Sequence, residues 1–166
     1  MSLKSAFAGA LPTLIALVFA GVALSQTPPK EGKYEVTSCS SAVLTSIAFS
    51  PTHSASNWEL MGMNVSNPPG GLLDKATFRC VGLSSMLDGK NSARWVCELV
   101  DAEGGSKLLS YWTNEDGKTT RTHYVGTGKF EGIELTTTAE SLGLSSKIKP
   151  GTFQTCGRNT GTYKLK

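Results

Sequence analysis

Four strands joined by three turns are predicted in residues 75–125, which read KATFRCVGLSSMLDGKNSARWVCELVDAEGGSKLLSYWTNEDGKTTRTHYV. The predicted strands are Lys75–Leu83, Ala93–Val100, Lys107–Thr113 and Lys118–Val125. In Ala93–Val100, Trp95, Cys97 and Leu99 alternate with the residues between them, as they do when a strand presents two faces. The dipeptide Asp88-Gly89 favours a two-residue hairpin turn. The region therefore predicts successive antiparallel hairpins.

Short runs with strand character also occur on both sides of this region. Before it lie Lys33–Thr37, Ala42–Phe49 and Asn57–Asn64, and after it lie Lys129–Thr138, Lys147–Cys156 and Thr160–Leu165. Ala139–Leu144 is predicted as a loop or a short helical turn. No long segment has apolar residues at helical spacing, so an all-β fold is expected.

The short connections favour an antiparallel meander of eight or nine strands. An open meander has two exposed edges, and closure into a small barrel removes them. We therefore expect an all-β, antiparallel meander closing into a small barrel, with a two-sheet β-sandwich as the alternative.

The N-terminal residues 1–25 have the pattern of a secretory signal peptide. Lys4 precedes an apolar run, Ala6–Leu24, and Ala23 and Ser25 are small residues at the positions that a signal peptidase reads. Cleavage is expected before Gln26, and a retained membrane anchor is the alternative. The domain prediction is a signal peptide at 1–25, a flexible segment at 26–32 and a single β-barrel domain at 33–166. The mature protein is expected in the periplasm or secreted, with no membrane span.

All four cysteines lie in the expected mature chain: Cys39, Cys80, Cys97 and Cys156. In an oxidising compartment an even number suggests two disulfides, for which three pairings exist. The midpoint between Cys80 and Cys97 falls in the Asp88–Gly89 turn, so hairpin pairing would place these two cysteines opposite each other. We therefore prefer Cys80–Cys97, which leaves Cys39–Cys156 to tie the chain ends together.

Composition and motifs argue against several functions. A net charge of +3, from 16 basic and 13 acidic residues in 166, argues against a dedicated nucleic-acid binder. Two histidines exclude a multi-histidine metal site, and no zinc, nucleotide or hydrolase motif is present. The acidic residues Asp101, Glu103, Glu115 and Asp116 do not match a calcium loop, so solvated hairpin turns are expected. We expect no metal and no cofactor, and we assign no catalytic residue.

Six short motifs lie between residues 80 and 165: Cys80-Val81-Gly82, Asp88-Gly89-Lys90, Trp95-Val96-Cys97-Glu98, Asp101–Gly105, Gly126–Ile133 and Gly161–Leu165. Through these motifs, residues 75–166 resemble a group of exported bacterial proteins. The barrels of that group are similar to those of allene oxide cyclase and dirigent proteins and are lipocalin-like. Most members have no assigned activity, so the resemblance implies a fold and an envelope location and gives no reaction.

Two polar candidates for a binding site lie in one predicted strand, Lys118–Val125. If the hairpins pair as their turns suggest, His123 shares a row with the Cys80–Cys97 pair, and Arg121 and Val125 point to the same face. Inside a barrel, Arg121 and His123 could bind a carboxylate or perform acid–base chemistry. A slip of one residue would reverse this assignment, and a packing or surface histidine is the alternative.

Aromatic residues in predicted strands are the other candidates for a site. A barrel of eight strands is either filled by such side chains or hollow enough for one small ligand. The first hypothesis is therefore an exported binding module for a small apolar ligand. The candidate ligand-binding residues are Trp58, Trp95, Trp112, Tyr111, Arg121 and His123.

Two other hypotheses compete with ligand binding. Both faces of two predicted strands carry apolar residues, so the protein could have a filled barrel whose outer surface meets a second copy or an envelope partner. An isomerase or cyclase acting on an apolar substrate is the third hypothesis, and it rests on fold analogy alone.

Overall fold

The computed structural model describes residues 29–144 and 147–166, so the predicted signal peptide at 1–25 lies outside the described residues. The described chain is all-β, with one short 3-10 helix, η1 (Gly128–Phe130). The strands are β1 (Glu31–Ser50), β2 (His53–Ser66), β3 (Thr77–Leu87), β4 (Lys90–Val100), β5 (Lys107–Glu115), β6 (Lys118–Gly126), β7 (Glu134–Leu135), β8 (Thr138–Leu144) and β9 (Thr152–Lys164). Among these residues, no helix has the length and apolar character needed to cross a membrane.

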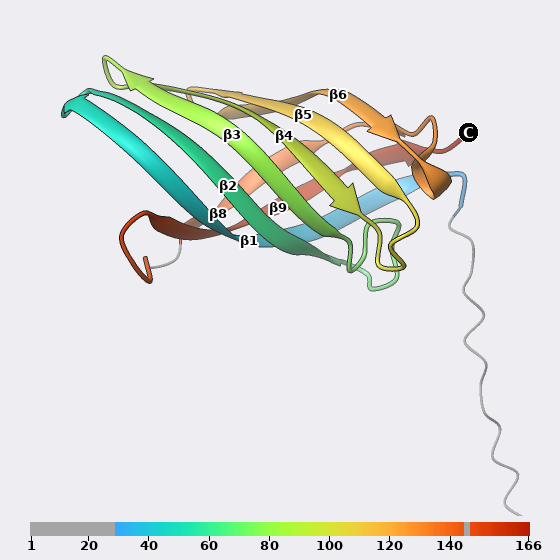
Figure 1. The fold of residues 1–166 in the computed structure, drawn as a ribbon. Coiled ribbons are helices and arrows are strands. Elements are labelled where there is room, and N and C mark those ends of the chain that lie inside the picture. The colour runs from blue at the N-terminus through green and yellow to red at the C-terminus, as the bar shows by residue number, and fades with distance from the viewer. Residues whose placement is uncertain (1–28, 145–146) are drawn as a thin grey trace, which may run out of the picture.

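The strands form one antiparallel sheet in the order β6-β5-β4-β3-β2-β1-β9-β7, with β8 also paired to β9. The sheet curls until its two edges approach each other (Figure 1). At this seam the backbone N–H of Leu135 in β7 donates a hydrogen bond of 3.1 Å to the Tyr124 hydroxyl of β6. The described residues of β6 form no ladder with β7 or β8. The predicted antiparallel meander is confirmed as a curled, barrel-like sheet.

Two hairpin turns explain why the middle of the chain folds in this register. Asp88 and Gly89 have φ angles of 51° and 76°, and Asp116 and Gly117 have φ angles of 47° and 86°. Two successive positive φ angles define the turn whose twist matches that of paired strands, and Asp-Gly adopts it readily. These turns set the pairing of β3 with β4 and of β5 with β6.

Strand boundaries differ from the predictions at both ends of the chain. Lys33–Thr37 and Ala42–Phe49 belong to one strand, β1. The second half of Lys147–Cys156 and nearly all of Thr160–Leu165 belong to one strand, β9. The ladder between β1 and β9 runs without interruption through the mainly polar residues that separate the predicted runs. Cross-strand hydrogen bonds therefore extend both strands where the local sequence shows no strand pattern.

The segment between β6 and β9 also differs from its prediction. Lys129–Thr138 is not a single strand, because the chain turns through η1 to bury Phe130 and pairs with β9 only at β7 and at Thr138, the first residue of β8. Ala139–Leu144 is neither a loop nor a helical turn, since pairing with the edge of β9 makes it part of β8. Tertiary pairing outweighs the weak local preference of both segments.

Both predicted disulfides are present, and each joins residues that face each other on neighbouring strands. Cys80–Cys97 joins β3 to β4, with Cys80 buried at 3% exposure. Cys39–Cys156 joins the first strand to the last, and Cys39 is exposed. Two disulfides indicate an oxidising compartment rather than the cytoplasm.

The hydrophobic core lies at one end of the barrel, which we call the closed end. Residues 67–76 and η1 cover this end (Figure 1). The buried cluster comprises Tyr34, Val36, Leu72, Leu73, Ala76, Leu99, Leu108, Phe130, Ile133 and Tyr163. Phe130 has no exposed surface, and full burial of such a side chain contributes about 1.5–3 kcal/mol. The packed closed end therefore anchors the curled sheet.

Candidate functional site

A cavity of about 460 Å³ lies inside the curled sheet and extends from the closed end. Most of the strands contribute side chains to its wall. Glu140 and Ser141 of β8 also line it, so the cavity reaches the seam between the two edges of the sheet. The apolar lining includes Tyr34, Val36, Leu60, Leu73, Phe78, Trp95, Leu99 and Trp112, and the polar lining includes Ser38, Asn64, Ser110, Asn114, Thr119, Arg121 and Asn159. Mostly apolar walls with a few polar groups are typical of small-molecule sites.

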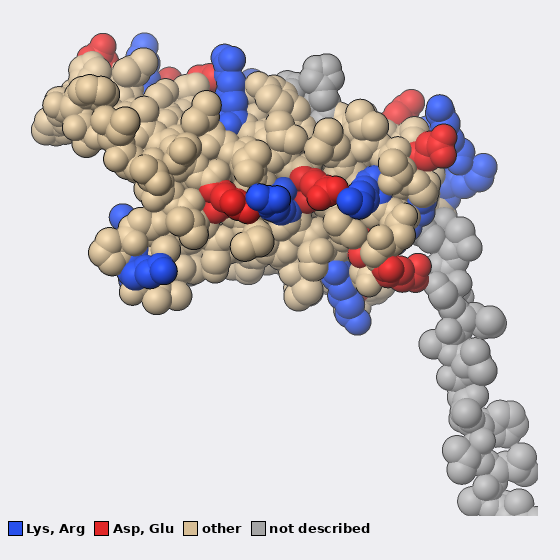
Figure 2. All heavy atoms as spheres, in the orientation of Figure 1, with Lys and Arg blue, Asp and Glu red and all other residues tan. Residues whose placement is uncertain are grey.

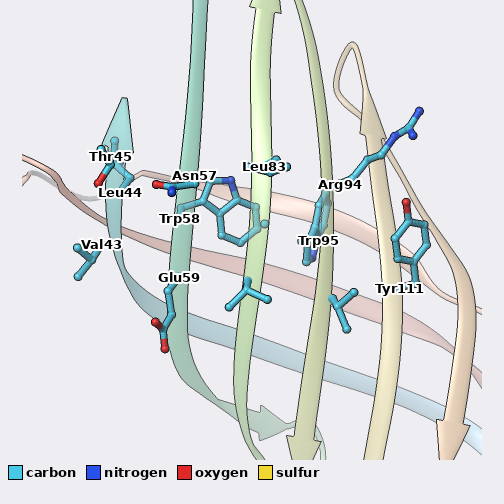
Figure 3. A pocket seen from close by; sticks show the side chains of 13 residues that line it. Val43, Leu44, Thr45, Asn57, Trp58, Glu59, Leu83, Arg94, Trp95 and Tyr111 are labelled. Atoms are coloured by element: carbon cyan, nitrogen blue, oxygen red, sulfur yellow. The ribbon is translucent and has the colours of Figure 1, made fainter. Parts of the chain in front are cut away.

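Four large side chains form a row across five strands, from Trp58 in β2 through Trp95 and Trp112 to Arg121 in β6. The ring centroids of Trp95 and Trp112 are 6.0 Å apart with parallel planes, and those of Trp58 and Trp95 are 5.9 Å apart. Gly82 lies between Trp58 and Trp95, and a Cβ atom there would collide with the Trp58 ring. Figure 3 shows Trp58 reaching from β2 toward β3. The missing side chain at Gly82 therefore makes room for this aromatic row.

Arg121 is a cation without an anionic partner. Its Cζ atom lies 4.2 Å from the centroid of the Trp112 ring, in a cation–π contact. The Arg121 Nε and Nη1 atoms and the Trp112 Nε1 atom are inaccessible to solvent and form no hydrogen bond with the described residues. All 13 acidic residues of the chain belong to the described part, and none forms an ion pair with Arg121.

The surroundings of Arg121 are apolar or neutral. Burial lowers the pKa of Arg121, and the charged groups that would oppose this effect are only the ionised phenols of Tyr34 and Tyr124. Burial also raises the pKa of Tyr34 above its usual 10.0, so this phenol is neutral at ordinary pH. Because an arginine stays protonated in proteins, the guanidinium keeps its charge next to neutral groups.

A β-bulge in β6 places His123 in a different row from the one predicted. The register shifts between Tyr111 and Trp112, so Tyr111 faces His123 while Trp112 faces Arg121. Two residues of β6 advance where β5 advances by one, so the predicted row of His123 with the Cys80–Cys97 pair is wrong. The side chain of His123 lies outside the described residues.

The bulge also changes which predicted residues share a face. Val125 is 66% exposed, whereas the prediction placed it inside with Arg121. Tyr111 lines a second, more open groove, together with the exposed Val43 and Leu83 (Figure 3). Trp58 and Trp95 also line this groove, and Trp95 lines the cavity as well. Of the predicted candidates, Trp95, Trp112 and Arg121 line the cavity, and the Trp58 ring packs against Trp95 at an interplanar angle of 53°.

Sequence reasoning missed a polar network on the opposite wall. Asn159 Nδ2 donates to Ser38 Oγ at 3.1 Å, and Ser38 Oγ donates to Asn64 Oδ1 at 2.7 Å. Nearby, the Tyr34 hydroxyl donates to the backbone carbonyl of Thr136 at 3.0 Å. These residues come from β1, β2 and β9, so only the fold brings them together. Alternation along β1 could have placed Ser38 inside, because Val36 is two residues before it.

One of the acidic turns differs from its prediction. Asp101 is not solvated, because its side chain is only 3% exposed and pairs with Lys129 Nζ at 3.2 Å. Its carboxylate also accepts the Ser106 backbone N–H at 3.1 Å. The segment that follows β6 folds back over this turn and excludes water from it. Across residues 29–144 and 147–166, no cluster of three or more His, Cys, Asp or Glu could hold a metal ion.

The outer face carries a line of alternating charges and an uncharged region beside it (Figure 2). Arg79 pairs with Glu59, and Lys107 pairs with Glu98 at 2.8 Å, so the line crosses β2 to β5. The groove of Tyr111 is open to solvent on this sheet. The inner cavity is the better candidate site, because it is more enclosed and contains an unpaired cation.

Comparisons with protein-family models, curated proteins and solved structures found no match for this chain. The resemblance to the barrels of allene oxide cyclase and dirigent proteins therefore stays a prediction.

Proposed function

We propose that this protein is an exported binding protein that holds one small, mainly apolar molecule in its barrel cavity. The observation that carries the proposal is the cavity of about 460 Å³ beside the parallel rings of Trp95 and Trp112. Pockets for small molecules have volumes of about 300–1,000 Å³ and are lined mainly by apolar side chains. Export is supported by the two disulfides and by the signal-like pattern of residues 1–25.

The positions of the core and of the two disulfides relative to the cavity support this function. The packed cluster of the closed end shares Tyr34, Val36, Leu73 and Leu99 with the cavity lining, so the core forms one end of the cavity and does not fill the rest. The two disulfides tie β1 to β9 and β3 to β4 around the cavity. A wall held by cross-links keeps its shape without a ligand, which lowers the entropic cost of binding.

Titration with N-phenyl-1-naphthylamine, a neutral dye that fluoresces in apolar surroundings, tests the proposal. We expect saturable binding and quenching of tryptophan fluorescence. Ser110→Phe fills the cavity from a buried position, whereas Ser41→Phe places the same side chain at an exposed position. Loss of dye binding in Ser110→Phe alone would support the proposal. No binding by the wild type, or equal binding by both variants, would overturn it.

A second candidate function is contact with another protein through the outer face. Exposed apolar residues gather on β1 to β3 and at the hairpin tips, namely Val43, Ile47, Phe49, Val81, Leu83 and Leu87. A surface of this kind is typical of an interface. Sedimentation over a range of concentrations tests for self-association, and purification from the exporting host followed by cross-linking tests for a partner. A monomer without cross-links in both experiments would exclude this function.

A further inference from the structure

We propose that the ligand of the cavity carries a single carboxylate, and that Arg121 binds it. This inference rests on the proposed function, because it names the chemical class of the molecule that occupies the same cavity. It specifies how the ligand is oriented, with its carboxylate at Arg121 and its apolar body along the tryptophan rings.

The first argument is the unpaired charge of Arg121. Proteins pair a charge that they remove from water, because an isolated charge is costly in an apolar environment. No acidic residue pairs with Arg121, and the contact with the Trp112 ring compensates only part of the lost hydration. A ligand anion would supply the missing partner.

The second argument is the set of donors around Arg121. The Arg121 Nε and Nη1 atoms and the Trp112 Nε1 atom have no acceptor among the described residues, and both residues line the cavity. Neighbouring protein atoms cover all three nitrogens, so a carboxylate in the cavity reaches them once the Arg121 side chain changes its rotamer. A carboxylate is acceptor-only and offers two oxygens. A planar guanidinium is also suited to bind a carboxylate with two parallel hydrogen bonds.

The third argument limits the charge of the ligand. Arg121 is the only Lys or Arg among the described residues that line the cavity. Glu140 is the only acid there, and its carboxylate lies 3.9 Å from Arg158 rather than near Arg121. One cation balances one negative charge, so a monoanion suits this site better than a phosphate monoester with nearly two charges.

Calorimetric titration with decanoate and 1-decanol tests this inference, because the two probes have the same chain and differ at the head group. We expect wild-type protein to bind decanoate about 10- to 100-fold more tightly than decanol, as a charge-assisted hydrogen bond allows. In Arg121→Met we expect the two affinities to become equal, with the decanol affinity unchanged. Arg121→Lys retains a point charge and should keep part of the preference. Arg94→Met, at an exposed arginine, should keep all of it.

The outcomes separate the carboxylate inference from the proposed function. If wild-type protein binds both probes equally, an apolar ligand site remains and the carboxylate inference is wrong. If Arg121→Met keeps the preference, the carboxylate binds elsewhere and the inference is also wrong. If neither probe binds and the naphthylamine dye also fails, both proposals are wrong. The wild-type comparison alone is decisive if Arg121→Met does not fold.

Discussion

The closed end and the cavity of this barrel treat buried charge in opposite ways. At the closed end, Asp101 pairs with Lys129, and the Asp74 carboxylate accepts backbone N–H groups from Ser66 and Gly70. In the cavity, Arg121 has an aromatic ring beside it but no anion. The chain therefore satisfies the buried Asp101 and the half-buried Asp74 where it needs stability, and leaves Arg121 unpaired where we propose that it binds a ligand.

This difference matters because an unsatisfied polar group is a net cost to folding. Natural proteins tolerate such costs mainly at functional sites. The packed cluster around Phe130 offers stability that can offset a local deficit in the cavity. The comparison thus predicts opposite responses to substitution at the two ends.

The largest effect is expected at the closed end from Phe130→Ala. Phe130 has no exposed surface, so the substitution leaves a cavity and should lower the free energy of unfolding by about 3–5 kcal/mol. Urea denaturation measures this change. Leu83→Ala, at a position 67% exposed, is the matched control and should change stability by less than about 0.5 kcal/mol. Equal effects of the two substitutions would show that the closed end is not the core.

The second-largest effect is expected from acid, which should lower the stability of the closed end. Burial alone would raise the pKa of Asp101, but the hydrogen bond from Ser106 and the Lys129 ammonium outweigh burial and hold it below its usual 3.8. Hydrogen bonds from Ser66 and Gly70 also lower the pKa of Asp74. A lowered folded-state pKa gives stability that is present above about pH 4 and is lost as the pH falls through that pKa.

Urea denaturation at pH 6 and pH 3 measures the acid effect. Asp101→Asn should lower stability at pH 6 by about 1–3 kcal/mol and should flatten the loss between the two pH values. If Asp101→Asn keeps the pH dependence of the wild type, Asp101 is not a cause of the loss of stability in acid.

In the cavity, Arg121→Met should change the free energy of unfolding in the opposite direction. Replacing an unpaired cation with an apolar side chain of similar length should raise the stability of the empty protein by about 1 kcal/mol. Saturating decanoate should reverse this order, because only the wild type gains a charged partner. Thermal melts with and without decanoate measure both effects. A variant that is less stable in both conditions would mean that Arg121 is a structural residue.

The smallest effect is expected on the outer face. Lys107 and Glu98 form an exposed pair at 2.8 Å, with side chains 55% and 46% exposed. Lys107→Ala should change stability by less than about 0.5 kcal/mol, and added salt should reduce the difference. A loss larger than that of Asp101→Asn would show that the charged line matters more than the buried pair.

Much of the fold was accessible from local sequence, whereas most long-range features were not; the Cys39–Cys156 disulfide is the exception, because it was the pairing left once Cys80–Cys97 was preferred. Asp-Gly turns predicted the hairpins of β3 to β6, and the position of one turn predicted the Cys80–Cys97 disulfide. The uninterrupted β1 was missed because its polar centre is held by ladders with β2 and β9. The bulge in β6 has no clear local signal, and it moved His123 out of its predicted row.

Some residues of the candidate site were likewise predicted from the sequence, and others were missed. The tryptophans were predicted because they are large aromatic residues in strands, and Arg121 because the expected pairing placed it on the face of the Cys80–Cys97 pair. The wall formed by Ser38, Asn64 and Asn159 was missed, because these common polar residues come together only when the first and last strands pair. The missing anion beside Arg121 could not be seen in the sequence, since it depends on where all acidic residues lie in space.

Native mass spectrometry of the protein purified from its native host tests the central claim most directly, with organic extraction of the same sample. We expect the oxidised chain plus one reproducible additional mass, recovered as an apolar monocarboxylic acid and absent from Arg121→Met. The contradicting result is the bare mass of the oxidised chain, unchanged after decanoate is added in excess.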